Sequence, residues 1–220
     1  LFEPMGMATA PGDQLIVTTC SAGVWKRHNQ KWTLIAEGLL DLLGVVVEED
    51  GSLIVGQKPE LTRLRDADGW FEHYETLSDD FLATGNYHEY LHGPAKGVDG
   101  NYYIQLNLAE HGNKNAIYKA GGKWMGAQGG YRGWSLQVTP EGETTLFARG
   151  LRSPAGLVKG PDEKLYYSEN HGEYVGTKAL QVNISGIPPL SKNRVFHFES
   201  RQLPATKGAM SEAFYSVVVE

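Results

Sequence analysis

The sequence has little cysteine, no long apolar run and no concentration of positive charge. Its single cysteine, Cys20, excludes an intrachain disulfide and any haem or zinc motif that needs two cysteines. The longest apolar run, Leu39 to Val47, is interrupted by Asp41, so no segment of this chain is expected to cross a bilayer. The net charge is −6, and basic residues form local pairs such as Lys26-Arg27 rather than a stripe. We therefore expect no nucleic-acid partner, because nucleic-acid binding needs clustered lysine and arginine.

Amphipathic helices are also missing, because no segment convincingly repeats its apolar residues at helical spacing. What the chain has in excess is glycine, with 27 residues, alongside 11 tyrosines and 5 tryptophans. Glycine-rich turns between aromatic and β-branched stretches predict an all-β protein.

A hairpin motif recurs four times along the chain. Each copy is a short strand, a turn that carries Asp or Gly, and a second strand of apolar and aromatic residues, as in residues 50–55 and 99–104. A second hairpin follows each of the first three copies, for example 135–138 with 144–148. The copies are anchored by Gly6, Gly44, Gly93 and Gly156. Four-strand units that repeat about every 40–45 residues predict a β-propeller.

The repeat predicts one propeller domain over residues 1–220. Its blades are expected at about 4–39, 40–80, 85–151 and 152–186, with a remnant of a further blade at 187–220. A six-bladed type is expected, and about four readable blades do not close such a ring. We therefore expect this chain to be part of a longer one. The sequence begins at Leu1 without methionine, so its numbering is expected to start inside a longer precursor.

Two segments at the predicted entrances of inner strands carry candidate functional side chains. The first contains His88, flanked by Asn86 and Glu89, just before the inner strand of the third blade. A histidine here can serve as a general base, because imidazole exchanges protons near neutral pH. The alternative is that His88 only hydrogen-bonds a neighbouring blade. Glu89 is the weaker candidate, since neighbours on an extended strand point to opposite sides.

The second segment runs from Gly150 to Leu157 and places Arg152 beside Ser153 at the entrance of the fourth blade. The forked guanidinium of Arg152 suits a carboxylate or the oxygens of a quinone, and a salt bridge between blades is the alternative. One hairpin later, a turn at Asn170, His171 and Gly172 can offer backbone oxygens to Ca²⁺.

Aromatic side chains near these segments are candidates for stacking on a sugar ring. They are Tyr87, Tyr131 and Trp134. For Trp134, packing inside a blade is the favoured alternative. The stretch Asp66-Ala67-Asp68-Gly69 resembles the start of a calcium loop, although an ordinary β-turn is the favoured interpretation.

Five stretches carry a resemblance to a known family. They read Gln-Lys-Pro-Glu-Leu-Thr-Arg-Leu at 57–64, Gly-Asn-Tyr-His-Glu-Tyr at 85–90, Arg-Gly-Trp at 132–134, Gly-Leu-Arg-Ser-Pro-Ala-Gly-Leu at 150–157 and Ser-Glu-Asn-His-Gly at 168–172. Over about residues 4–184, the chain resembles the soluble quinoprotein glucose/sorbosone dehydrogenase superfamily of six-bladed propellers. It is most similar to the membrane-bound dehydrogenase branch, whose propellers are often fused to haem-binding domains.

This resemblance implies a site that holds pyrroloquinoline quinone and Ca²⁺. It implies that His88 takes a proton from the sugar while hydride passes to the quinone. Arg152 is implied to contact the quinone, with Asn86 and Ser153 as further cofactor-binding residues. Ca²⁺ near residues 170–172 is implied to polarise the quinone as a Lewis acid. A cytochrome or a haem domain is the implied electron acceptor.

Three functions follow from these residues. The leading hypothesis is a secreted or periplasmic enzyme that oxidises a sugar or a sugar-derived alcohol or aldehyde, with His88 as base and Arg152 as cofactor clamp. One alternative is a metal-dependent hydrolase or lyase that acts on a lactone or a polysaccharide. The other is a non-catalytic propeller that binds a carbohydrate or a protein, for which His88 and Arg152 are expected more than about 10 Å apart.

Overall fold

The structure is a computed structural model. It describes residues 3–83, 86, 88–110, 125–126, 130–149, 151, 153–169, 178–182, 198–202 and 213–219. For residues 109–110, 125–126, 169 and the strands after 177, it describes the backbone only.

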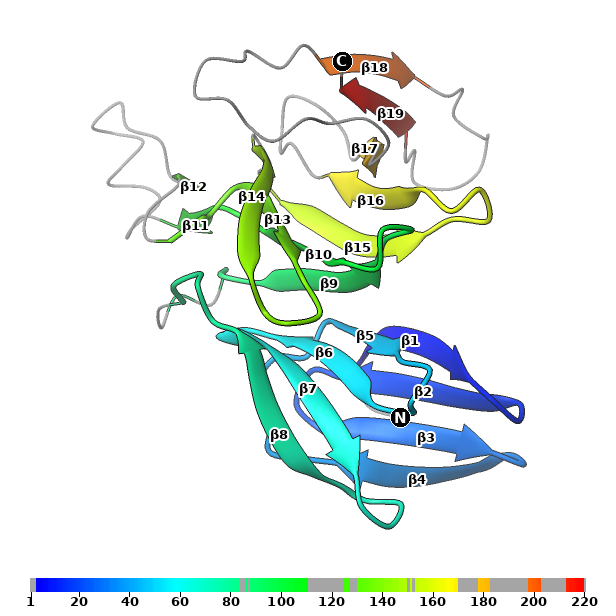
Figure 1. Ribbon diagram of the computed structural model, residues 1–220. Coiled ribbons are helices and arrows are strands. Elements are labelled where there is room, and N and C mark those ends of the chain that lie inside the picture. Colours follow the sequence, from blue (N-terminus) through cyan, green and yellow to red (C-terminus); the bar gives the residue numbers. More distant parts are fainter. Residues whose placement is uncertain are drawn as a thin grey trace.

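The described residues form β-sheets that follow one another in chain order, and all their strand pairs but one are antiparallel (Figure 1). The first sheet contains β1 (Pro4–Ala10), β2 (Gln14–Thr19), β3 (Val24–His28) and β4 (Lys31–Ala36), in that order. The second sheet contains β5 (Gly44–Val47), β6 (Leu53–Gln57), β7 (Glu60–Asp66) and β8 (Phe71–Ser78), also in chain order.

The third sheet carries an inserted pair of strands, and the fourth sheet has five strands. The third sheet contains β9 (Leu91–Lys96), β10 (Tyr102–Leu106), β13 (Trp134–Val138) and β14 (Thr144–Arg149), and the short pair β11 (Ala109–Glu110) and β12 (Met125–Gly126) lies between β10 and β13 in the chain. The fourth sheet contains β15 (Pro154–Lys159), β16 (Leu165–Glu169), β17 (Lys178–Val182), β19 (Ala213–Val219) and β18 (Phe198–Gln202). β19 joins β17 in parallel.

Aspartate side chains hold the turns of the repeated hairpins. In three of them, an Asp oxygen accepts a hydrogen bond from the backbone N–H two residues later, over 2.9–3.3 Å: Asp50 with Ser52, Asp99 with Asn101, and Asp162 with Lys164. Such side-chain bonds close a turn locally, which explains why Asp recurs in the sequence repeat. The bonds that Asp50 accepts from Ser52 also hold the pKa of the Asp50 carboxyl below its usual value.

In the two interior sheets, the strands β6 and β10 are buried on both faces. In β6, Val55 belongs to the core cluster shared with the first sheet, and its neighbour Ile54 belongs to the cluster shared with the third. In β10, Ile104 faces the second sheet, whereas Tyr103 packs with Tyr167 of the fourth. Successive residues of a strand point to opposite faces, so a strand between two covered faces needs an unbroken apolar run.

This stacking confirms the predicted all-β propeller fold, and the predicted second hairpins are present as the pairs β3–β4, β7–β8 and β13–β14. The first strands of the four sheets, β1, β5, β9 and β15, are neighbours in space. The blade boundaries, the single domain over 1–220 and the assignment of residues 187–220 to a further blade stay predictions. In the described part of the chain, no helix is long and apolar enough to cross a membrane.

Candidate functional site

His88 lies in a turn just before β9, the inner strand of the third sheet. The backbone N–H of His88 donates to the side-chain oxygen of Asn86 at 3.0 Å, and the N–H of Glu89 donates to the Asn86 carbonyl at 3.2 Å. The sequence predicts that His88 precedes the inner strand, and β9 does begin after it, at Leu91. The sequence also treats His88 and Glu89 as neighbours on extended backbone, whereas the backbone there forms a turn. The correction has a local cause, because an Asn side chain that bonds two residues ahead replaces strand with turn. We call residues 86 and 88–90 the His88 loop.

A buried lysine of the second sheet contacts this loop. Lys58 directly follows β6, only 8% of the residue is exposed, and its Nζ donates to the Asn86 carbonyl at 2.6 Å. The side chain of its neighbour Gln57 bonds within its own blade. It accepts from Leu40 N at 3.0 Å and donates to the Thr62 hydroxyl at 2.7 Å. The turn after β6 therefore reaches across to the third blade through Lys58.

An asparagine of the third sheet holds the loop from the other side. Asn107 follows β10 and is buried. Its amide nitrogen donates to the His88 carbonyl, and its amide oxygen accepts from Tyr90 N at 2.7 Å. One side chain thus satisfies a backbone donor and a backbone acceptor on either side of Glu89, which fixes the course of the loop.

A fully buried arginine completes the support. Arg132 is 1% exposed, and its two terminal nitrogens donate to the carbonyls of Tyr90 and Leu82 at 3.1 and 3.0 Å. Burial lowers the pKa of the Arg132 guanidinium, and the carboxylate of Glu89, which is 2% exposed, acts in the opposite direction. Glu89 is therefore placed to balance a buried charge.

Polar groups are also buried in the strands behind the loop. Gln105 of β10 lies opposite His92 of β9 in the register of the sheet, so both side chains point to the same face. Gln105 is 0% exposed, and neither of its amide atoms has a hydrogen-bond partner among the described residues. An orphaned amide of this kind marks a place where a ligand or a water molecule can bind. The sequence signal is a lone glutamine in an apolar strand, and sequence reasoning missed it.

His92 makes the stability of the protein depend on pH. Burial lowers the pKa of His92 to about 4. In the unfolded chain His92 binds a proton below about pH 6.5, whereas in the folded protein it does so only below about pH 4. Because the unfolded chain takes up this proton more readily, the contribution of neutral His92 to the stability of the folded protein is complete above the pKa of the unfolded state. It is lost as the pH falls towards the pKa of the folded state.

We expect the free energy of unfolding to fall by about 1–3 kcal/mol from this group between pH 7 and pH 4. The range allows for the ring's remaining contact with solvent. Urea unfolding at both pH values measures the slope, with the His92→Gln variant as reference. An equal slope in protein and variant would contradict the assignment.

The remaining predicted site residues fall in different places. Ser153 directly precedes β15, the inner strand next to β9. Trp134 begins β13, packs against the core shared with the second sheet, and lies with its ring 5.9 Å from the Arg149 guanidinium carbon. Tyr131, 36% exposed, lies in the turn before it. Five of the predicted site residues lie outside the described residues: Tyr87, Arg152, Asn170, His171 and Gly172. The predicted distance between His88 and Arg152 therefore stays untested.

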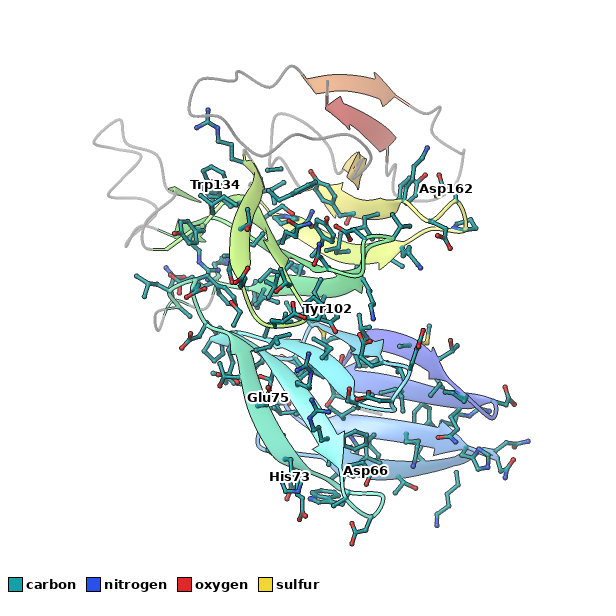
Figure 2. The ribbon with its side chains drawn as sticks, viewed as in Figure 1. Asp66, His73, Glu75, Tyr102, Trp134 and Asp162 are labelled. Carbon is teal, nitrogen blue, oxygen red and sulfur yellow. The ribbon has the colours of Figure 1, made fainter. Side chains whose placement is uncertain are left out.

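Two grooves on the surface lie away from the His88 loop. One, of about 430 Å³, is lined by residues that include Lys96 and Tyr102. Lys96 ends β9 and Tyr102 begins β10, whereas the His88 loop precedes β9, so groove and loop are at opposite ends of the third sheet. The other groove, of about 490 Å³, borders the turn after β7. Figure 2 shows Asp66 and His73 near the tip of that hairpin, far from Trp134.

The turn at residues 66–69 closes a hairpin, as the favoured interpretation has it. Asp66 accepts a hydrogen bond from Gly69 N, and β7 and β8 pair on either side of the turn. Among the residues that the structure describes, no group of three or more His, Cys, Asp or Glu side chains is placed to hold a metal.

Comparison with known proteins finds a likeness to solved structures and none to a protein family. No protein-family model and no curated protein matches this chain. A glucose-dehydrogenase-type oxidoreductase from Thermus thermophilus superposes with a TM-score of 0.66 at 17% identity, over 83% of this chain and 63% of its own. The quinone-bound aldose sugar dehydrogenase of Streptomyces coelicolor gives 0.59 at 17% identity, over 83% and 60%. A protein described as a gluconolactonase gives 0.56 at 17% identity, over 99% and 64%.

At these identities the likeness is one of fold. The chain resembles quinoprotein sugar dehydrogenase propellers and also a lactonase propeller, and it spans less than two thirds of the length of each. Because one fold can support several reactions, the likeness of fold does not identify the reaction.

Proposed function

We propose that this protein is an oxidoreductase of the quinoprotein type that oxidises a sugar or a sugar-derived alcohol or aldehyde, with His88 as its general base. The observation that favours this role is the set of hydrogen bonds that hold the backbone of the His88 loop. Buried polar side chains from two sheets hold the backbone around one histidine at the entrance of an inner strand. The blades of a propeller surround a central channel, and we expect a small ligand to bind where the entrances of the inner strands face it.

His88 would accept the proton of the hydroxyl group that is oxidised. A neutral imidazole within hydrogen-bond reach of that hydroxyl can take its proton as the C–O bond becomes a carbonyl. Oxidation also removes a hydride from the same carbon, and the family resemblance names pyrroloquinoline quinone as its acceptor. Gln105, with both amide atoms unpartnered among the described residues, offers a donor and an acceptor for a bound polar group.

The described residues do not by themselves fit the carboxylates of that quinone. Two buried cations that contact the loop, Lys58 and Arg132, donate to backbone carbonyls instead. Arg152, the cation predicted for the quinone, lies outside the described residues, as do the residues predicted for Ca²⁺. Quinone and Ca²⁺ therefore enter this proposal through the resemblance, and a cytochrome or a haem domain as electron acceptor enters in the same way.

The experiment is dye-coupled oxidation of a panel of aldoses, alditols and sugar aldehydes, with and without added quinone and Ca²⁺. Turnover that requires the quinone supports the proposal. Lactone hydrolysis without dye reduction would replace it with the hydrolase alternative, and sugar binding without either reaction would replace it with a binding protein. Reduction of an added cytochrome tests the electron acceptor, and fractionation of producing cells tests the proposed secreted or periplasmic location.

A further inference from the structure

Side chains from elsewhere in the fold hold the backbone of the His88 loop. Lys58 bonds the carbonyl of Asn86, Asn107 bonds His88 and Tyr90, and Arg132 bonds Tyr90. Of these three side chains, Asn107 and Arg132 flank strands of the loop's own sheet. Lys58 is the one of the three that comes from the second sheet, so it relates the loop to a neighbouring blade.

A buried lysine is an unusual residue for that position. Lysine is almost never fully buried without a partner, because removing an ammonium group from water is costly. An apolar side chain of similar length would fill the same space at lower cost. What the ammonium adds is a charge-assisted hydrogen bond, here 2.6 Å long, to one particular carbonyl.

That carbonyl belongs to the residue that shapes the turn. The side-chain oxygen of Asn86 accepts a hydrogen bond from His88 N. The backbone carbonyl of Asn86 accepts from both Lys58 Nζ and Glu89 N. Any shift of the Asn86 peptide therefore moves the point from which the His88 side chain projects. In a site assembled from several blades, a displacement of about 1 Å can cost about 100-fold in rate.

We infer that Lys58 is a positioning residue, which sets the place of the His88 side chain relative to the second blade by holding the carbonyl of Asn86. Its effect on rate rests on the proposed function, in which His88 is the base. Its effect on the loop does not depend on that function, because the hydrogen bond to Asn86 acts on structure before any substrate binds.

The test compares Lys58→Met, which keeps the length of the side chain and removes the donor, with Lys58→Arg, which keeps a charged donor. Lys96→Met is the matched control, because Lys96 also joins two sheets, through Glu48, but at the far end of β9. We expect Lys58→Met to lower kcat about 10- to 100-fold with little change in KM. Lys58→Arg should recover much of the rate, and Lys96→Met should leave it unchanged.

A second measurement separates failure of this inference from failure of the proposed function. The seven histidines can be labelled, and the His88 ring signal can be assigned by its loss in His88→Gln. Lys58→Met should shift or broaden that signal and leave the signal of His73, on the exposed part of β8, in place. This holds even if the protein oxidises no sugar.

An unchanged His88 signal and an unchanged kcat in a folded Lys58→Met protein would overturn the inference. So would a loss of thermal stability alone, with kcat intact, because Lys58 would then only support the fold. If Lys58→Met does not fold, Lys58→Gln provides a shorter, uncharged donor, and the same signal and rate decide the question. A changed His88 signal without sugar oxidation would keep Lys58 as a positioning residue and remove the proposed reaction.

Discussion

Replacing His88 by alanine is expected to lower the rate of sugar oxidation about 10²- to 10⁴-fold, the usual contribution of a general base. The proton of the reacting hydroxyl would then have to leave to water. The fold should persist, because two supports of the loop bond backbone atoms that the substitution keeps: His88 N donates to Asn86, and Asn107 donates to the His88 carbonyl. Steady-state kinetics with the dye assay measures the loss, and circular dichroism checks the fold.

His73→Ala is the control for this experiment. His73 lies on β8 with 67% of its side chain exposed, and its ring contacts the carboxylate of the neighbouring Glu72 at 3.7 Å. It should lose no activity. If His88→Ala oxidises sugars at the rate of the unmodified protein, His88 is not the base, and the alternative that it only hydrogen-bonds a neighbouring blade gains support.

The sequence predicts the fold well because the turns and strands of each repeat are determined by residues that are close together in the sequence. Asp50 and Asp99 each bond a backbone N–H two residues away, so the turn of each hairpin is encoded within a few letters of sequence. The strands that follow them are equally local signals, since an unbroken apolar run such as Leu53 to Val55 is needed wherever both faces are covered.

The candidate site is predicted less completely because its contacts join distant residues. Lys58 contacts Asn86 across 28 positions, and Arg132 contacts Tyr90 across 42. Nothing within a strand or turn distinguishes a buried Lys58 from the exposed lysines that are typical of turns. The sequence identifies His88 as a candidate from its neighbours, but the side chains that hold its loop emerge only when the sheets are stacked.

Stability depends in turn on how closely those sheets approach at the centre. Gly44, at the start of β5, is one of the four glycines that anchor the repeat. A Cβ atom at this position would lie 2.2 Å from the carbonyl oxygen of Gly93 and 2.6 Å from its carbonyl carbon, both in the backbone of β9. Neither atom can swing aside as the end of a side chain can, so the inner strands would have to separate.

We expect Gly44→Ala to lower the free energy of unfolding by about 3 kcal/mol, at the upper end of the usual cost of overpacking a core. The thermal midpoint should fall by about 6–12 °C. Urea and thermal unfolding measure the change. Because β9 also follows the His88 loop, activity should fall together with stability.

Gly51→Ala separates this steric effect from the ordinary cost of replacing glycine. Gly51 has a φ of +84°, which disfavours alanine by about 1 kcal/mol, but beyond its two chain neighbours no residue has an atom within 4 Å of its Cβ position. Gly44 carries no such positive φ, so its cost comes from contact alone. If the two variants lose equal stability, the close approach of β5 and β9 is not what requires glycine at the centre. If Gly44→Ala loses about three times as much, glycine is required at position 44 because β5 and β9 meet there backbone to backbone.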